Sequence, residues 1–89
     1  MNRTKPTVSK LYAGQLEPGD VGKTIRFQMY YGYVLGRLDS VAQVVNEWTG
    51  TPAMRLRVSW DGRWSKAVKT HWLSHAHPVE LIEDADGQD

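Results

Sequence analysis

The sequence predicts an all-β protein, a small five-stranded barrel with one short helical turn before the last strand. Apolar and polar residues alternate with period two in several stretches, which is typical of strands with one buried and one exposed face. Glycine, proline, asparagine and aspartate separate these stretches, as tight turns require. With 89 residues the strands can enclose only one small core, so a single domain is predicted over residues 11–83.

The stretch from Gly22 to Trp48 predicts two strands joined by a tight turn. In the first strand Ile25 and Phe27 belong to the apolar half of the alternation. Gly32 then supplies the residue that tolerates the positive φ of a two-strand turn, and β-favouring residues resume directly after it. The rest of the chain is expected to pack on this hairpin.

The second strand is predicted to be unusually long and bent. Gly36 and an Asp39-Ser40 break interrupt its alternation, and such interruptions let a strand turn around a small barrel. The alternative is a short helix over residues 40–48 with Ser40 as its cap. The valine and threonine residues of that segment disfavour a helix.

Residues 54–60 form the most regular alternation and predict a third strand. The Asp-Gly pair at residues 61–62 indicates a hairpin into a fourth strand over residues 64–70. The hairpin loop has two or three residues. A three-residue loop is favoured because it places Val68 opposite Leu56, whereas a two-residue loop puts the apolar faces on opposite sides.

The remaining segments are shorter. Residues 1–10 are predicted to be a flexible basic arm, either disordered or binding nucleic acid, and residues 11–16 an edge strand or a helical turn. Residues 71–75 predict one turn of helix. Residues 78–82 predict a final short edge strand that begins with proline, and residues 84–89 an acidic tail.

Composition limits the classes of function. The formal charge is +1, but the last ten residues hold five of the ten acids, which leaves the preceding chain basic. The chain has no cysteine, which excludes disulfides and thiolate metal sites and predicts a reducing, cytoplasmic location. No apolar run is long enough to cross a bilayer, and the first residues lack the apolar centre of a secretory signal, so no membrane partner is expected.

The predicted order of strands resembles the small barrels of the Src-homology-3-like and Sm-like kind over residues 21–82. Gly32, followed by Gly36-Arg37-Leu38 and then Asp39, is similar to the first motif of Sm-like proteins. The acidic residue that usually precedes the turn glycine is replaced by tyrosine, and the second motif is not recognisable in MRLRVSWDG. The resemblance therefore implies the fold and assigns no residue to an RNA pocket.

The segments DVGKTIRF and HPVELIED also resemble small proteins encoded by bacteriophages of actinobacteria. This resemblance implies a non-structural phage protein that acts by binding inside the host cell.

The sequence predicts no enzyme and no cofactor. Asp20, Asp39 and Asp61 stand at turns or bends, where aspartate caps backbone amides. Phosphate-binding loops, a nucleophile elbow and a Ser/His/Asp pattern are absent from the sequence. Paired histidines on a helical turn, His71 and His75, could hold Zn²⁺ with His77, but an exposed polar turn is the favoured interpretation, and no metal is predicted.

Two binding surfaces are predicted. A basic stripe with aromatic neighbours could bind RNA or DNA. Its residues are Arg26, Arg37, Arg55, Arg57, Lys66 and Lys69. An aromatic surface, together with the unpaired edges of the strands over residues 78–82 and after Trp64, could bind a host protein or a second copy of the chain. Its residues are Tyr30, Tyr31, Tyr33, Trp64 and Trp72. Protein binding is the leading prediction, and nucleic-acid binding is the alternative.

Overall fold

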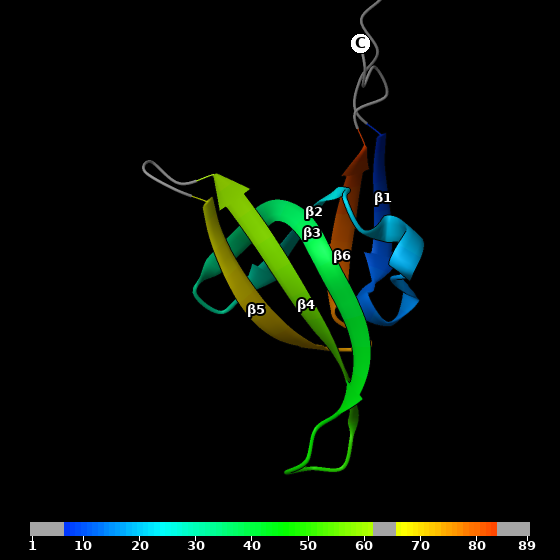
Figure 1. Cartoon of the computed structure of the whole chain (residues 1–89). Coiled ribbons are helices and arrows are strands. Elements are labelled where there is room, and N and C mark those ends of the chain that lie inside the picture. The colour runs from blue at the N-terminus through cyan, green and yellow to red at the C-terminus, as the bar shows by residue number, and fades with distance from the viewer. Residues whose placement is uncertain (1–6, 62–65, 84–89) are drawn as a thin grey trace, which may run out of the picture.

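A computed structural model describes residues 7–61 and 66–83, and these residues form one antiparallel sheet of six strands (Figure 1). The order across the sheet is β1-β6-β2-β3-β4-β5. The elements are β1 (Thr7–Tyr12), η1 (Ala13–Gln15), η2 (Pro18–Asp20), β2 (Thr24–Met29), β3 (Gly32–Val45), β4 (Pro52–Asp61), β5 (Lys66–Ser74) and β6 (Pro78–Glu83). The all-β prediction is confirmed. Helix in the described residues is limited to two single turns, neither of them long enough to span a membrane.

The β2–β3 hairpin confirms the predicted strand pair. Met29 pairs with Gly32, so Tyr30 and Tyr31 form a two-residue turn. Gly32 has a φ of +134°, a conformation that residues with a Cβ rarely adopt. Phe27 on β2 faces inward and is buried, as its place in the alternation predicts.

Strand β3 is long and bent, as predicted, and the helix alternative over residues 40–48 is wrong. The register with β4 shifts between Leu38 and Ser40, which places a bulge at Asp39. At Gly36 the backbone of β4 comes very near. A Cβ at this position would lie 2.4 Å from the carbonyl oxygen of Ser59, so only glycine allows β3 to fold this closely over β4.

The predicted pairing of the third and fourth strands is wrong. Leu56 pairs with His71 instead of Val68, and Val68 pairs with Ser59 and is 46% exposed. The reason is that His71 occupies an inward position that the sequence pattern reserves for an apolar residue. Asp61, predicted to lie in the hairpin loop, pairs with Lys66 in the sheet, and residues 62–65 lie outside the described residues.

The helical turn predicted over residues 71–75 is also wrong, because β5 continues to Ser74. His71 and Leu73 are buried and Trp72 is exposed, so period two holds to the end of the strand. The chain then reverses in a tight turn that is closed by the backbone N–H of His77, which donates to the carbonyl of Ser74 at 3.1 Å.

Strand β6 is not an edge strand. It confirms the prediction of a strand beginning at Pro78, but it pairs with β1 along its whole length and with β2 through residues 80–82. Residues 7–10, predicted to belong to a flexible arm, are part of β1. The sheet therefore has six strands instead of five, and it is open between its end strands, β1 and β5, so the predicted barrel is not confirmed. Residues 1–6 and 84–89 lie outside the described residues.

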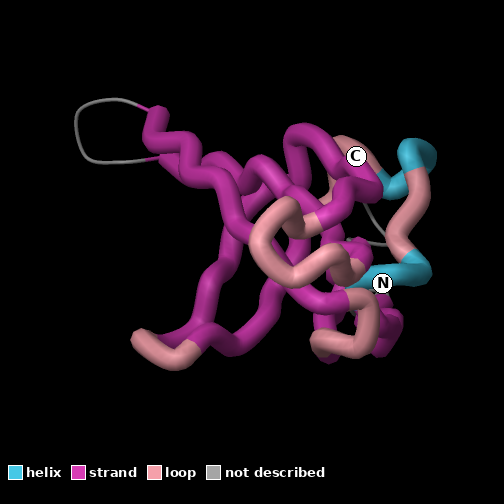
Figure 2. The backbone as a smooth tube through the Cα atoms, turned by 90° about the horizontal axis from the view of Figure 1, so that it is seen from below, coloured by secondary structure: helices cyan, strands magenta, loops and turns pink. Residues whose placement is uncertain are grey.

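The core lies on the inner face of the sheet. Figure 2 shows how the strands curve around this face. Both short helices lie on the same side of the molecule in that view. Helix η1 packs against the core through Ala13, which is fully buried and whose N–H donates to the carbonyl of His77 at 2.8 Å. The buried apolar residues are Ala13, Leu16, Ile25, Phe27, Val34, Leu38, Met54, Leu56, Val58, Leu73, Val79 and Leu81.

Candidate protein-binding surface

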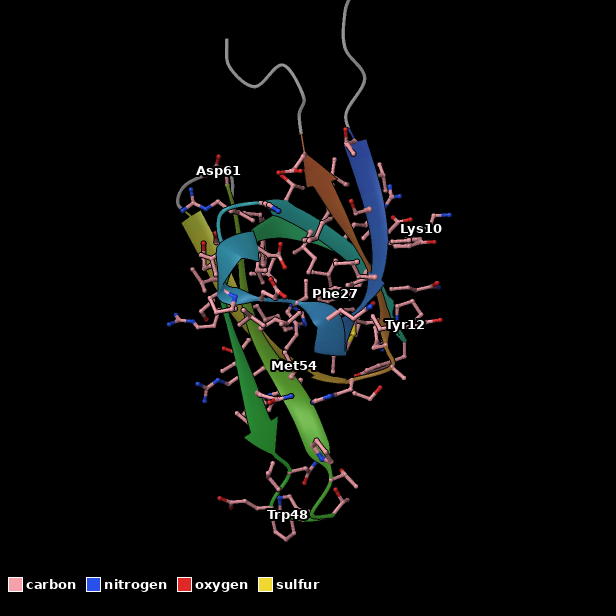
Figure 3. The ribbon with its side chains drawn as sticks, turned by 90° about the vertical axis from the view of Figure 1, so that its right-hand side faces the viewer. Lys10, Tyr12, Phe27, Trp48, Met54 and Asp61 are labelled. Carbon is pink, nitrogen blue, oxygen red and sulfur yellow. The ribbon has the colours of Figure 1, made fainter. Side chains whose placement is uncertain are left out.

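The β3–β4 hairpin projects from the body of the sheet and carries a tryptophan at its end. β3 ends at Val45 and β4 begins at Pro52, so residues 46–51 form the connecting loop. Figure 3 shows Trp48 at one end of the molecule and Asp61, at the other end of β4, on the opposite side. The Trp48 side chain is 96% exposed, although an indole is among the side chains that gain most from burial.

Hydrogen bonds within the loop hold Trp48 in place. The Asn46 side-chain oxygen accepts from the N–H of Trp48 at 2.9 Å and from that of Thr49 at 3.3 Å. The Asn46 carbonyl accepts from the N–H of Gly50 at 2.7 Å, and the Asn46 N–H donates to the carbonyl of Thr51 at 2.8 Å. Gly50 has a φ of +72°, which suits glycine. The loop backbone that carries the indole is therefore held by its own hydrogen bonds.

The outer face of the sheet beside this loop carries further exposed apolar groups. Val45 and Trp72 are exposed, and the Arg55 guanidinium lies 5.9 Å from the centre of the Trp72 ring, where a cation is attracted to the aromatic face. Arg55 and Trp72 are paired residues on β4 and β5, so they point to the same face. With Trp48 they border a hollow of about 510 Å³. We call Val45, Trp48, Arg55 and Trp72 the indole surface.

A larger hollow lies where β2 and β6 separate. Their pairing ends at Arg26 and Glu80, whose side chains form an ion pair. Beyond this point the two strands diverge, and His77 Nε2 lies 2.8 Å from the carbonyl oxygen of Gln28 in β2. The resulting hollow, which we call the β2–β6 cleft, has a volume of about 640 Å³. It is lined by Lys10, Leu11, Tyr12, Arg26, Phe27, Gln28, Met29, Tyr33, His77, Pro78, Val79 and Glu80.

The predicted tyrosine cluster is solvent-accessible at the β2–β3 turn. Tyr30 is 97% exposed, and its ring meets that of Tyr31 edge-on with centroids 5.0 Å apart. Tyr33 borders the β2–β6 cleft. Trp72 lies on the indole surface, away from these tyrosines in the fold, and Trp64 lies outside the described residues. The predicted aromatic residues therefore divide between two surfaces.

The structure does not gather the six predicted basic residues into one stripe. Arg26 is paired with Glu80, and Arg37 Nε lies 3.2 Å from Asp39 Oδ1. Lys69 is the cross-strand partner of Val58, whose side chain faces inward. Lys69 therefore lies on the other face of the sheet from Arg55 and Arg57. Arg55 and Arg57 are exposed on the outer face of β4, Arg37 lies opposite Ser59 on the neighbouring strand, and the Lys66 side chain lies outside the described residues.

Sequence reasoning left Trp48 out of the predicted sites. The signal was present, because Trp48 stands in a turn segment with Asn46, Gly50 and Pro52 around it, where few apolar neighbours can cover an indole. No sequence pattern predicted the β2–β6 cleft, because its lining comes from segments that are distant in the sequence.

The structure places the three histidines in different surroundings. The His71 ring is buried beside Phe27, His77 reaches the β2 backbone, and His75 packs against Gly14. No group of three or more potential metal-ligating side chains occurs in residues 7–61 and 66–83.

His71 makes stability depend on pH. Burial lowers the pKa of the His71 imidazole below its ordinary 6.5, and the positive charge of Lys69 lowers it further. Its Nδ1 lies 3.3 Å from the Tyr31 hydroxyl. Because the folded pKa is below the unfolded one, the unfolded chain binds the proton more readily. The contribution of neutral His71 to the free energy of unfolding is complete above about pH 6.5. It is lost as the pH falls from there toward the pKa of His71 in the folded protein.

We therefore expect the free energy of unfolding to fall between about pH 7.5 and pH 5 in the wild type and to fall less in His71→Gln. Urea titrations at each pH measure both slopes. The other histidines are present in both proteins, so the difference in slope reports His71 alone. If the free energy of unfolding fell equally steeply with pH in both proteins, His71 would not be the source of the pH dependence.

Comparison of the chain with protein-family models, with curated proteins and with solved structures found no match.

Proposed function

We propose that this protein is a non-enzymatic binding protein, and that it acts by inserting Trp48 into an apolar hollow of another protein. The exposed indole on its hydrogen-bonded loop carries this proposal. Tryptophan is enriched among the residues that dominate binding energy at protein interfaces, because its burial removes a large apolar area from water.

The order of the loop supports the same proposal. A mobile loop would lose conformational entropy when a partner fixes it, and that loss would weaken binding. The bonds to Asn46 lower this cost for the loop backbone beforehand. Val45 and Trp72 extend the apolar area around the indole, and Arg55 supplies a cation at its border.

Two of the carboxylates that could have served catalysis make structural contacts. Asp20 accepts a hydrogen bond from the backbone N–H of Glu17 at 2.9 Å and pairs with Lys23. Asp39 pairs with Arg37 at the β3 bulge. These contacts support a binding role over acid–base chemistry.

The proposal is tested by affinity capture from a lysate of an actinobacterium, the kind of host that the phage resemblance implies. The bait is the wild type, Trp48→Ala or Tyr30→Ala, and both recovered polypeptides and recovered nucleic acid are identified. We expect a polypeptide that the wild type and Tyr30→Ala retain and that Trp48→Ala loses by at least about tenfold. Tyr30 is the matched control because it is equally exposed at a different turn.

Two outcomes would contradict the proposal. If Trp48→Ala retains every polypeptide that the wild type retains, the indole is not the contact. If Tyr30→Ala causes the loss instead, the tyrosine turn is the binding surface, as the residue types first predicted.

RNA or DNA binding is the second candidate, and one observation favours it. Arg55 lies over the Trp72 ring and Arg57 is the next outward residue on β4, so an aromatic face and two cations share one surface. In the capture experiment this candidate predicts nucleic acid that is retained at low salt, released steeply as salt rises, and lost in Arg55→Ala/Arg57→Ala. Recovery of polypeptide from nuclease-treated lysate separates the two candidates.

A further inference from the structure

We infer that a second copy of this chain receives Trp48, and that the receiving site is the β2–β6 cleft. This inference depends on the proposed function and names its partner. One chain carries both halves of the contact, a projecting indole and an apolar hollow, and Figure 3 shows them well apart, with Trp48 at the end of the hairpin and Lys10, Tyr12 and Phe27 in the body of the sheet. The indole of one copy therefore meets the cleft of another.

The cleft has the size and the chemistry that an indole requires. Its volume of about 640 Å³ exceeds what one side chain occupies and falls in the range of protein ligand sites. Phe27 and Val79 form a buried apolar floor, and the partly buried Met29 adds a polarizable thioether. Exposed tyrosines, Tyr12 and Tyr33, border the opening and offer ring contacts to an inserted tryptophan.

The charges beside the two halves are complementary. Glu47 precedes Trp48 on the loop and is exposed, so it carries a negative charge next to the indole. Lys10 lines the cleft and is exposed on β1. Neither residue takes part in an ion pair within the described part of the chain, whereas Arg26 and Glu80 at the same cleft already neutralise each other. Insertion of Trp48 brings Glu47 to a cleft that is lined by two cationic side chains, Lys10 and Arg26, and one carboxylate, Glu80.

The contact is head to tail, because the two faces differ. Each copy that inserts its indole still has its own cleft open for another copy. Such heterologous contacts continue until a ring closes or a filament grows. The average mass in solution is therefore expected to rise with protein concentration.

The first test is sedimentation of the wild type over a range of concentrations, beside Trp48→Ala, Lys10→Glu and Lys10→Glu/Glu47→Lys. We expect concentration-dependent association of the wild type and at least about tenfold weaker association of either single variant. The double variant reverses both charges and is expected to recover association. Circular dichroism spectra confirm that each variant is folded.

Mixing the two single variants gives a second test. Trp48→Ala keeps an intact cleft, and Lys10→Glu keeps an intact indole, so one copy of each can join through a single contact. At concentrations where neither variant associates alone, the mixture is expected to form dimers and nothing larger. A chain that carries both Trp48→Ala and Lys10→Glu lacks the indole and the intact cleft. It is expected to stay monomeric when it is studied alone.

A monomeric wild type at all concentrations would overturn this inference, and so would association that Trp48→Ala leaves unchanged. The proposed function is judged separately. A monomeric chain that still captures a foreign polypeptide through Trp48 retains the proposed function and loses only the second copy as partner. A chain that shows neither association nor Trp48-dependent capture loses both.

Discussion

Gly36→Ala is expected to lower the free energy of unfolding by about 3 kcal/mol, the upper part of the range for overpacked interiors. The added Cβ would lie 2.4 Å from the Ser59 carbonyl oxygen and 2.8 Å from Val58 Cγ1. A flexible side chain can move away from such a contact, but Ser59 contributes backbone. β4 is held by β3 on one side and by β5 on the other, so its backbone cannot shift without loss of sheet hydrogen bonds.

Equilibrium unfolding in urea measures this effect, and Gly19→Ala is the matched control. Gly19 has no atom within 4 Å of a built Cβ and does not have a positive φ, so its replacement is expected to change stability by less than about 0.5 kcal/mol. Similar losses at Gly36 and Gly19 would mean that backbone entropy, and not the close approach of β4, determines the result.

Leu56→Ala is expected to cost about 3 kcal/mol, because it removes a fully buried side chain from the middle of the sheet. Leu56 lies on β4 between Val41 of β3 and His71 of β5, and both neighbouring strands limit how far the cavity can collapse. A cavity that cannot collapse adds its own cost to the lost burial.

Leu35→Ala is the control, since it makes the same chemical change at a side chain that is 57% exposed. Its cost is expected to stay below about 1 kcal/mol because most of the removed surface is already in water. If Leu35→Ala lowered the free energy of unfolding as much as Leu56→Ala, the result would contradict the core described above.

The strands that the sequence predicted well are those with a simple alternation. β2 alternates throughout and β4 alternates up to Val58, and the bend of β3 was predicted from Gly36 and the Asp39-Ser40 break. β1 was missed because all of its residues except Leu11 are exposed, so it has no buried face to produce a pattern. β5 was shortened because a histidine, a residue type usually assigned to the surface, stands at a buried position.

The candidate site was predicted only in part. Residue type alone pointed to exposed tyrosines at the β2–β3 turn, and Tyr30 confirms that exposure. Residue type could not show that Arg26 and Glu80, 54 positions apart, neutralise each other. The β2–β6 cleft depends on the same long-range pairing, and no local pattern records where two distant strands part.

The position of β6 between β1 and β2 also affects the order in which the chain can fold. β1 pairs only with β6 among the described strands, and β6 comes last along the chain. During synthesis the hairpins from β2 to β5 can form as they emerge, but β1 must wait, unpaired, until residues 78–83 leave the ribosome. Docking of β1 is therefore a late event, because its partner among the described strands is the last of them to be synthesised.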